Sequence, residues 1–341
     1  MTNPSRLLVL SLILTILAGF MFVRQALKWG FIDTPDARKV HTVPTPRTGG
    51  IAMVLGGILT LGIALALGWI HAPRLPWQTW TAGLGFLTMG GLDDRFSFQP
   101  RQKVLVFLAL AALAAWPWVL HFQSVGIPGL PSGSPAFRLF IPVAAGLLVF
   151  WFMAVPNAVN IEDAINGYMG GFLLILAVAA GWRGVNTWIP VGALLGFLLL
   201  NWPKAKHFMG DAGSFGGGFL IAEVVLRAGG FDHPLQAFFW TAPISLDVAM
   251  GLIRRKRLGM SPFEADRSTC PHHLLARFRG SHMKAAGLLW GNVAVCVCLA
   301  RWPVLASVYL LAYSSLLVFL NFHLLFPAKT PQPAGSQPGS N

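Results

Sequence analysis

Apolar runs long enough to cross a membrane follow one another along almost the whole chain. A helix needs about 20 apolar residues to span the hydrocarbon core of a bilayer. We place eleven such cores, at residues 7–23, 49–70, 77–92, 104–121, 138–155, 167–182, 187–202, 213–230, 235–253, 284–300 and 303–325. The sequence therefore predicts an all-α, polytopic transmembrane protein with about eleven helices.

The charge content supports a membrane environment. Only 11% of the 341 residues are charged, whereas a soluble domain carries about 25%. No polar block is large enough to fold as a separate soluble domain, so we predict one membrane-embedded domain over residues 1–326. The Pro/Gly/Ser-rich stretch at residues 327–341 has too little apolar surface to order itself, and we predict a disordered C-terminal tail.

The basic residues predict an orientation. Nineteen of the 25 lysines and arginines fall in loops on one side of the predicted spans. By the positive-inside rule, this side is cytoplasmic, which places the N-terminus outside and the C-terminus in the cytoplasm. The net charge of +13 is then a topological feature, and we expect no nucleic-acid partner.

The acidic residues gather on the same side. Ten of the twelve lie in or beside predicted cytoplasmic loops, Glu223 and Asp232 being the exceptions. A carboxylate at the end of an apolar span is costly unless it is solvated, paired or bound to a cation. Mg²⁺ is usually held by a few carboxylates together with substrate phosphates, so this distribution indicates a candidate metal site.

Two adjacent acids, Asp93 and Asp94, close the third span, and Lys103 begins the fourth. Adjacent carboxylates repel, so that one of them has a raised pKa or shares a cation. This arrangement suits a general base or a metal ligand. The alternative is a solvated helix end.

A second polar segment runs from Asn157 to Gly167. On a helix Asn160, Asp163 and Asn166 recur at three-residue steps, which places them on one face. A polar stripe that enters a membrane lines a site, or else it simply caps a helix.

A third segment, with Gly210, Asp211 and Gly213, opens the eighth span. Glycines at a helix N-terminus expose backbone N–H groups, which favour anions. Asp211 would hold a metal that bridges to phosphate, or it would be an N-cap residue among flexible glycines.

The long loop at residues 254–284 contains a run of four basic residues and the pair His272-His273. These side chains could contact nucleotide phosphates or anionic headgroups. Neighbouring loop histidines rarely reach the same ion, so we favour phosphate contact over zinc. A purely topological anchor is the alternative.

Five ordered motifs resemble one family. They are DTPDARKVHTVPTPRTGG, GLDDRFSFQPRQK, NAVNIEDAINGYMGG, KHFMGDAGS and RRKRLGMSPFEADRSTCPHH, between about Asp33 and Leu275. Together they resemble the polyprenyl-phosphate N-acetylhexosamine-1-phosphate transferases. The resemblance implies transfer of a sugar-1-phosphate from a UDP-sugar to undecaprenyl phosphate, with release of UMP. It also implies Mg²⁺, with Mn²⁺ as a substitute, and a multi-pass protein of the bacterial inner membrane whose active site faces the cytoplasm.

The resemblance also implies roles for residues. Asp93 would act on the lipid phosphate, with Asp94 beside it, and Asp211 would be the main metal ligand, supported by Asp94. Asp163 would be the third catalytic acid. Substrate contacts would come from Lys39, Lys103, Asn160, Asn166, Arg267, His272 and His273.

Two motifs depart from the family pattern. Asn166 stands where the family usually has a second acid, and Thr269-Cys270-Pro271 replaces an additional histidine before the pair. These changes keep open a non-catalytic paralogue that only binds the lipid phosphate. A transporter is disfavoured because the polar residues lie at the ends of helices and not at mid-bilayer.

The motif SPFEADR resembles the branch that uses UDP-GlcNAc or a related UDP-N-acetylhexosamine. That branch carries out the first membrane step of cell-envelope polysaccharides such as lipopolysaccharide O-antigen. The peptidoglycan branch, the phospho-MurNAc-pentapeptide transferases, typically has three consecutive histidines here and is the alternative. A homodimer is compatible with the family, although no residue pattern indicates one.

Overall fold

The computed structural model describes residues 3–35, 43–125, 133–229, 234–261 and 269–325. Lys39, Arg267 and the predicted tail at residues 327–341 lie outside this part of the chain. The described residues form twelve helices: α1 (Pro4–Trp29), α2 (Gly49–Ala66), α3 (Trp77–Phe96), α4 (Pro100–Val125), α5 (Pro135–Glu162), α6 (Tyr168–Trp182), α7 (Trp188–Asn201), α8 (Gly210–Gly229), α9 (Pro234–Arg257), α10 (Cys270–Arg277), α11 (His282–Leu299) and α12 (Pro303–Leu325).

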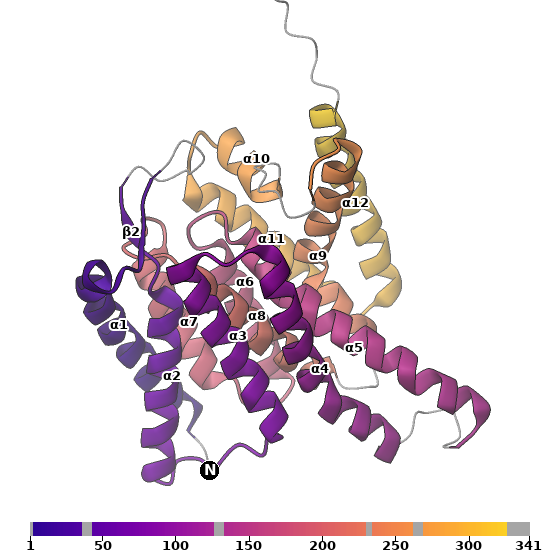
Figure 1. Ribbon diagram of the computed structural model, residues 1–341, viewed down its shortest axis with the longest axis horizontal. Coiled ribbons are helices and arrows are strands. Elements are labelled where there is room, and N and C mark those ends of the chain that lie inside the picture. Colours follow the sequence, from indigo (N-terminus) through magenta and orange to yellow (C-terminus); the bar gives the residue numbers. More distant parts are fainter. Residues whose placement is uncertain (1–2, 36–42, 126–132, 230–233, 262–268, 326–341) are drawn as a thin grey trace, which may run out of the picture.

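The helices confirm the predicted all-α architecture. Each of the eleven predicted spans overlaps one helix, and α10 is an additional short helix in the predicted cytoplasmic loop. Within the described ranges the only strands are β1 (Ile32–Asp33) and β2 (Thr45–Pro46), which pair antiparallel. They join α1 to α2 above the bundle (Figure 1).

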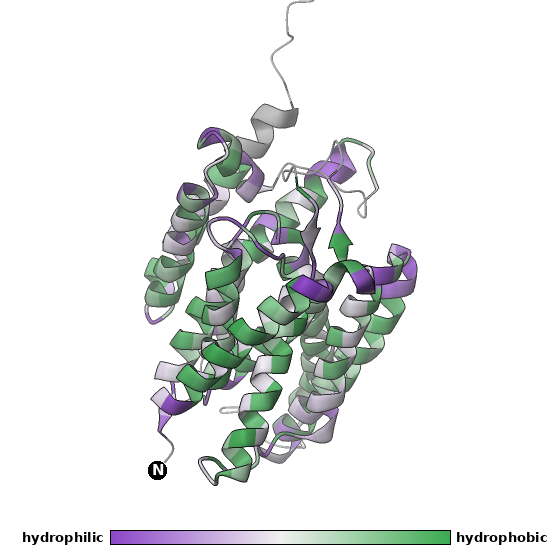
Figure 2. Cartoon of the chain, turned by 90° about the vertical axis from the view of Figure 1, so that its left-hand side faces the viewer, coloured by the Kyte–Doolittle hydropathy of each residue, from purple (hydrophilic) through white to green (hydrophobic). Residues whose placement is uncertain are grey.

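The chain is a multi-pass membrane protein. In the described residues, six helices are long and apolar enough to cross a membrane, namely α1, α2, α4, α5, α9 and α11, while α6, α7 and the described part of α12 are shorter apolar helices. Figure 2 shows that hydrophobic residues predominate along the middle of the helices and that hydrophilic residues are more frequent toward their ends. The two remaining predicted spans, α3 and α8, carry Asp93, Asp94 and Asp211 near their ends, which lowers their mean hydropathy.

Buried aromatic side chains fill the centre of the bundle. Phe86 of α3 stacks on Phe107 of α4 and on Phe219 of α8, with ring centroids 5.0 and 5.3 Å apart. On the outside, by contrast, Leu105 of α4 and Phe150 of α5 are 71% and 68% exposed. Apolar side chains exposed this far on long helices are compatible with lipid as the surrounding solvent.

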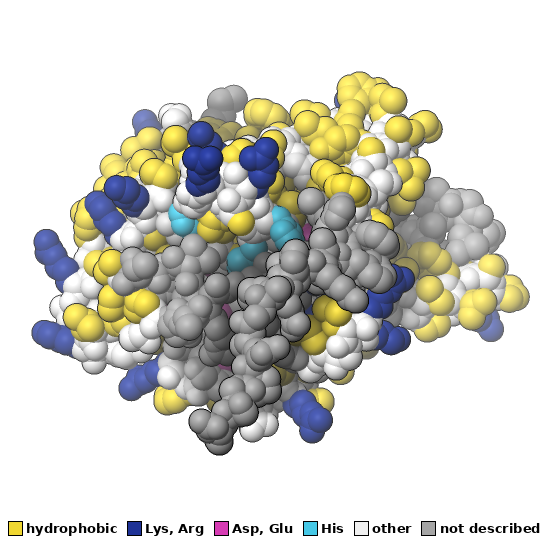
Figure 3. Space-filling model, turned by 90° about the horizontal axis from the view of Figure 1, so that it is seen from above, with side chains coloured by type: hydrophobic (Ala, Val, Ile, Leu, Met, Phe, Trp, Pro, Cys, Tyr) yellow, Lys and Arg dark blue, Asp and Glu magenta, His cyan; other side chains and the backbone are white. Residues whose placement is uncertain are grey.

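One end of the bundle is built differently from the other. The β1–β2 hairpin, α10 and the C-terminal end of α3 lie at the end opposite the N-terminus (Figure 1). Seen from that end, lysines and arginines surround a central region in which histidine side chains are visible (Figure 3). The described parts of the β1–β2 segment, the α3 motif and the α10 motif therefore lie at the same end of the bundle.

Candidate active site

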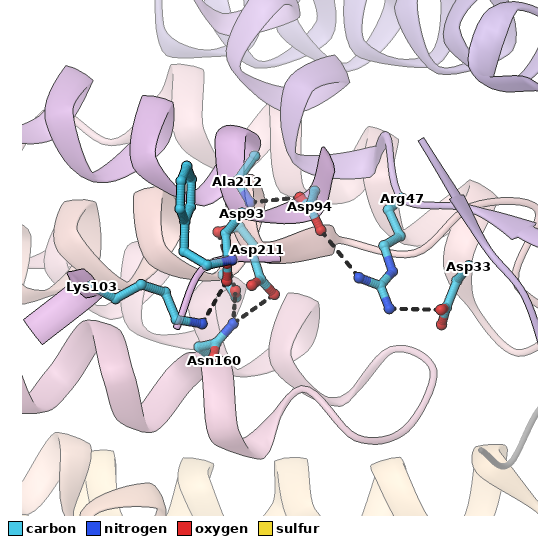
Figure 4. Close-up of polar contacts among 10 residues, drawn as sticks. Asp33, Arg47, Asp93, Asp94, Lys103, Asn160, Asp211 and Ala212 are labelled. Atoms are coloured by element: carbon cyan, nitrogen blue, oxygen red, sulfur yellow. Dashed lines mark hydrogen bonds and ion pairs between the residues drawn. The ribbon is translucent and has the colours of Figure 1, made fainter. Parts of the chain in front are cut away.

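An acid cluster forms where α3, α5 and α8 meet. Asp93 and Asp94 come from the last turns of α3, Asn160 from the end of α5 and Asp211 from the first turn of α8. The side chains of Asp93 and Asp211 are within hydrogen-bonding distance of each other. Asn160 Nδ2 donates to Asp211 Oδ1 at 3.0 Å. Figure 4 shows the cluster between Lys103 on one side and Arg47 on the other.

Glycines allow this meeting of helices. A methyl group at Gly90 of α3 would lie 2.2 Å from the carbonyl oxygen of Asp211, and one at Gly50 of α2 would lie 2.2 Å from the Cα of Gly213. The backbones of α2 and α3 thus touch the start of α8 directly. Gly210 has a left-handed φ of 70°, a conformation that glycine adopts without strain, and it starts α8 beside Asp94.

Asp93 is held by two donors. The backbone N–H of Phe98 donates to its Oδ1 at 2.7 Å, and Lys103 Nζ of α4 donates to its Oδ2 at 2.6 Å. Asp93 and Asp94 are only 6% and 8% exposed, so the alternative of a solvated helix end is excluded. Lys103, for which the resemblance implied a substrate contact, is a direct partner of Asp93.

Asp94 is held on one side only. Its Oδ2 accepts the backbone N–H of Ala212 at 3.0 Å. Its buried Oδ1 has no hydrogen-bond partner among the described residues, and Arg47 Nη1 lies 3.8 Å from it. Arg47 in turn binds Asp33 through Nη2 at 2.6 Å. The sequence assigned no role to Arg47 or Asp33, and their place in the motif DTPDARKVHTVPTPRTGG was the only indication that they belong to the site.

A further carboxyl group, that of Asp163, lies close enough to Asp94 to interact with it. Asp163 follows the last residue of α5 as its C-cap. Burial raises the pKa of Asp163 to about 7, and the negative charge of Asp94 adds to this effect. A carboxyl group in this state favours a bound proton or a nearby cation.

The donor set fits Mg²⁺. Among the described residues no group of three or more His, Cys, Asp and Glu side chains is arranged to enclose a metal. Mg²⁺ does not need such a cage, since it is usually bound by one or two carboxylates together with waters and substrate phosphates. The orphaned Oδ1 of Asp94 and the nearby carboxyl of Asp211 are hard oxygen ligands of the required kind.

Asn166 is engaged outside the acid cluster. Its side-chain Nδ2 donates to the carbonyl of Pro203 at 3.2 Å, and its backbone N–H donates to His282 Nδ1 at 3.1 Å. In the described part of the chain Asn166 has no hydrogen bond to the carboxyl groups of the acid cluster or to that of Asp163. The structure therefore gives the amide an anchoring contact where the sequence predicted a substrate contact.

The predicted histidines lie on α10. His272 and His273 are partly buried, and Thr269 Oγ1 lies 2.9 Å from His272 Nδ1. Burial raises the pKa of the neighbouring Cys270 thiol well above its usual range, which argues against a reactive cysteine. Cys270 and Cys296 are buried free thiols and Cys298 is an exposed one.

Comparisons with known proteins find relatives that are similar to this chain over most of its length. The family model for glycosyl transferase family 4 matches residues 77–229, the stretch from α3 to α8. The undecaprenyl-phosphate alpha-N-acetylglucosaminyl 1-phosphate transferase of Escherichia coli (strain K12) is 31% identical over 315 residues, covering 87% of this chain and 81% of that protein. The probable undecaprenyl-phosphate N-acetylglucosaminyl 1-phosphate transferase of Bacillus subtilis (strain 168) is 29% identical over 290 residues, covering 80% and 77%.

Proposed function

Because this chain belongs to glycosyl transferase family 4, we propose that it transfers a sugar-1-phosphate from a UDP-N-acetylhexosamine to undecaprenyl phosphate and releases UMP. Family membership confirms the resemblance drawn from the five motifs. The relatives' names support the class of polyprenyl-phosphate sugar-phosphate transferases and favour UDP-GlcNAc as the donor. We further propose that the product begins a cell-envelope polysaccharide.

One observation carries the proposal most directly. Lys103 and Arg47 approach Asp93 and Asp94 within a cluster that also contains Asp211. Positive side chains held by fixed acids are suited to receive phosphate groups, because their charge is positioned before the substrates arrive. Lys103 would receive one phosphate while Asp93 fixes its ammonium group.

The proposed reaction exchanges one phosphoanhydride for another. An oxygen of the lipid phosphate attacks the β-phosphorus of the UDP-sugar, the new P–O bond forms, and the bond to the bridging oxygen breaks. The electron pair of that bond leaves with UMP. Asp94 and Asp211 would hold Mg²⁺, which when bound supplies positive charge against the diphosphate.

The place of the site in the bundle is suited to these two substrates. The lipid's hydrocarbon chain stays in the bilayer, while the nucleotide comes from water, so the reacting phosphates must meet at the membrane surface. The acid cluster is built from the last turns of α3 and α5 and the first turn of α8, so it lies at the ends of these helices. By the positive-inside rule we propose that this end faces the cytoplasm of a bacterial inner membrane.

Two alternatives have their own observations. Asn166 and Thr269-Cys270-Pro271 depart from the family pattern, which motivates a paralogue that binds lipid phosphate without transfer. A phospho-MurNAc-pentapeptide transferase would use a different UDP-linked donor. The contact between Asp93 and Lys103 and the convergence of Asp93, Asp94 and Asp211 favour catalysis over binding alone.

The decisive experiment measures UMP release by purified protein in detergent with undecaprenyl phosphate, Mg²⁺ and UDP-GlcNAc. A parallel reaction contains UDP-MurNAc-pentapeptide. Asp211→Asn should lose activity, whereas Glu223→Gln should keep it, because Glu223 is held by Trp118 and Arg227 and not by the cluster. Release only with the pentapeptide donor would favour the peptidoglycan alternative. Lipid binding without release from either donor would favour the non-catalytic paralogue.

A further inference from the structure

A second pair of buried acids lies next to the active site. Glu162, the last residue of α5, is 0% exposed, and Asp247 of α9 is 2% exposed. The two carboxyl groups lie close enough to interact, and neither Glu162 oxygen has a hydrogen-bond donor among the described residues. Two ionised carboxylates at such a distance would repel, so the contact is favourable when a proton lies between them. The function proposed above uses neither residue.

Asp247 also holds the N-terminus of α10. Its Oδ2 accepts the backbone N–H of Cys270 at 2.7 Å, in a buried position. The first N–H groups of a helix have no partner within the helix. An acidic side chain placed there accepts a hydrogen bond from one of them, and its negative charge interacts favourably with the helix dipole. Asp247 therefore acts on α10 as a capping acid from another helix.

The short helix α10 depends on such contacts. It contains only eight residues, Cys270–Arg277, and isolated helices shorter than about 12 residues are marginal in water. Within its first turn Thr269 Oγ1 lies 2.9 Å from His272 Nδ1, and the Cys270 thiol interacts with Tyr313 of α12. Leu275, further along the helix, is buried in the core. Asp247 and Tyr313 therefore hold the N-terminal turn of α10, which carries His272 and His273.

Glu162 connects this anchor to the acid cluster. It directly precedes Asp163 and follows Asn160 by two residues in the same segment. Asn160 reaches Asp211, whereas Glu162 faces Asp247. One end of α5 thus contacts both the acid cluster and the acid that caps α10.

We propose that Glu162 and Asp247 are positioning residues that fix α10, and with it His272 and His273, relative to Asp163 for binding of the UDP-sugar donor. The inference rests on the proposed function for its substrate. The contact between Glu162 and Asp247 is a property of the fold and does not depend on which substrate binds. Glu162→Gln preserves it, since the amide N–H₂ group donates to Asp247 without a shared proton, and Glu162→Ala removes it.

Two measurements test the proposal. Amide hydrogen exchange of residues 270–277 in the substrate-free protein should be about tenfold faster in Glu162→Ala and near wild type in Glu162→Gln, as expected for the loss of one buried hydrogen bond. The KM for the UDP-sugar should rise about five- to tenfold in Glu162→Ala. The KM for undecaprenyl phosphate and kcat should change much less.

Glu223→Ala is the matched control because it also removes a buried carboxyl group, one bound to Trp118 and Arg227. It should leave exchange in α10 unchanged. Unchanged exchange of α10 in Glu162→Ala, or an equal increase in both alanine variants, would overturn the proposal. Faster α10 exchange with an unchanged donor KM would also overturn it. If the wild type releases no UMP with any donor and the exchange pattern still holds, the proposed function fails and the anchoring of α10 stands.

Discussion

The backbone of Gly90 in α3 lies directly against the carbonyl group of Asp211 in α8, where a methyl group would stand 2.2 Å from the oxygen. A separation this short excludes any side chain at residue 90 unless the helices move apart. Asp93 is one turn further along α3 and reaches the side chain of Asp211. The geometry of the acid cluster therefore depends on the absence of a side chain at Gly90.

Gly90→Ala should separate α3 from α8 and disrupt the cluster. Inserting a group into a packed contact costs about 1–3 kcal/mol, and we expect UMP release to fall at least about tenfold, since small displacements of reacting groups are costly. Gly91→Ala is the control, because its methyl group would meet Ala212 Cβ at an ordinary 3.8 Å. Thermal unfolding and initial rates measure both effects, and equal behaviour of the two variants would contradict the role of Gly90.

Lys103→Ala should reduce both activity and stability. It leaves the carboxylate of Asp93, whose side chain is 5% exposed, without its cation, and the loss of one partner of a buried pair costs about 3–5 kcal/mol. Arg101→Ala, at an exposed position in the same first turn of α4, should be near neutral. A double-mutant cycle with Asp93→Asn should give a coupling free energy of about 1–3 kcal/mol. Additive effects would show that the pair does not act as a unit.

Asp163 should make stability depend on pH in a definite direction. Burial raises its pKa to about 7, so between its ordinary value and pH 7 the folded state binds the proton more tightly than the unfolded state. The contribution of Asp163 to the free energy of unfolding is therefore present at low pH and is lost as the pH rises through about 7. Asp163→Asn should raise the Tm at pH 8 and leave it near wild type at pH 4, without added metal. A Tm difference independent of pH would contradict this assignment.

Mg²⁺ should stabilise the protein through Asp94 and Asp211. A ligand at 100 times its Kd adds about 2.7 kcal/mol to the stability of a folded protein. We expect a Tm increase with Mg²⁺ or Mn²⁺ that is reversed by EDTA and is absent in Asp94→Asn and Asp211→Asn. Glu223→Gln should retain the increase. An undiminished increase in both cluster variants would locate the cation elsewhere.

The helices and the acids could be predicted because each depends on local sequence. Apolar length identifies a span, and Asp93, Asp94 and Asp211 were conspicuous because acids at the ends of spans are rare and costly. Contacts between helices were not predictable in this way. The position of Arg47 beside Asp94, and of Asp33 beside Arg47, depends on how the β1–β2 hairpin folds back over the bundle.

Glu162 illustrates the same limit within one segment. Helical spacing places Asn160 and Asp163 on one polar face, and by that criterion Glu162 is only another acid near a membrane surface. Its burial against Asp247 arises from the packing of α5 on α9, for which the sequence of α5 contains no indication. The eight residues of α10 were likewise too short and too polar to be predicted as a separate helix.

Asn166→Asp tests whether the amide replaces a functional acid. Its Nδ2 donates to the Pro203 carbonyl, so an aspartate would lose this hydrogen bond and set a carboxylate against an acceptor. Loss of such a bond costs about 0.5–1.5 kcal/mol, and we expect a lower Tm with no gain in UMP release. Asn166→Ala, which removes the bond without adding charge, should lower the Tm less. If Asn166→Asp instead raised kcat/KM several-fold, the carboxylate would have reached the substrates, and the anchoring of this loop at Pro203 would not limit catalysis.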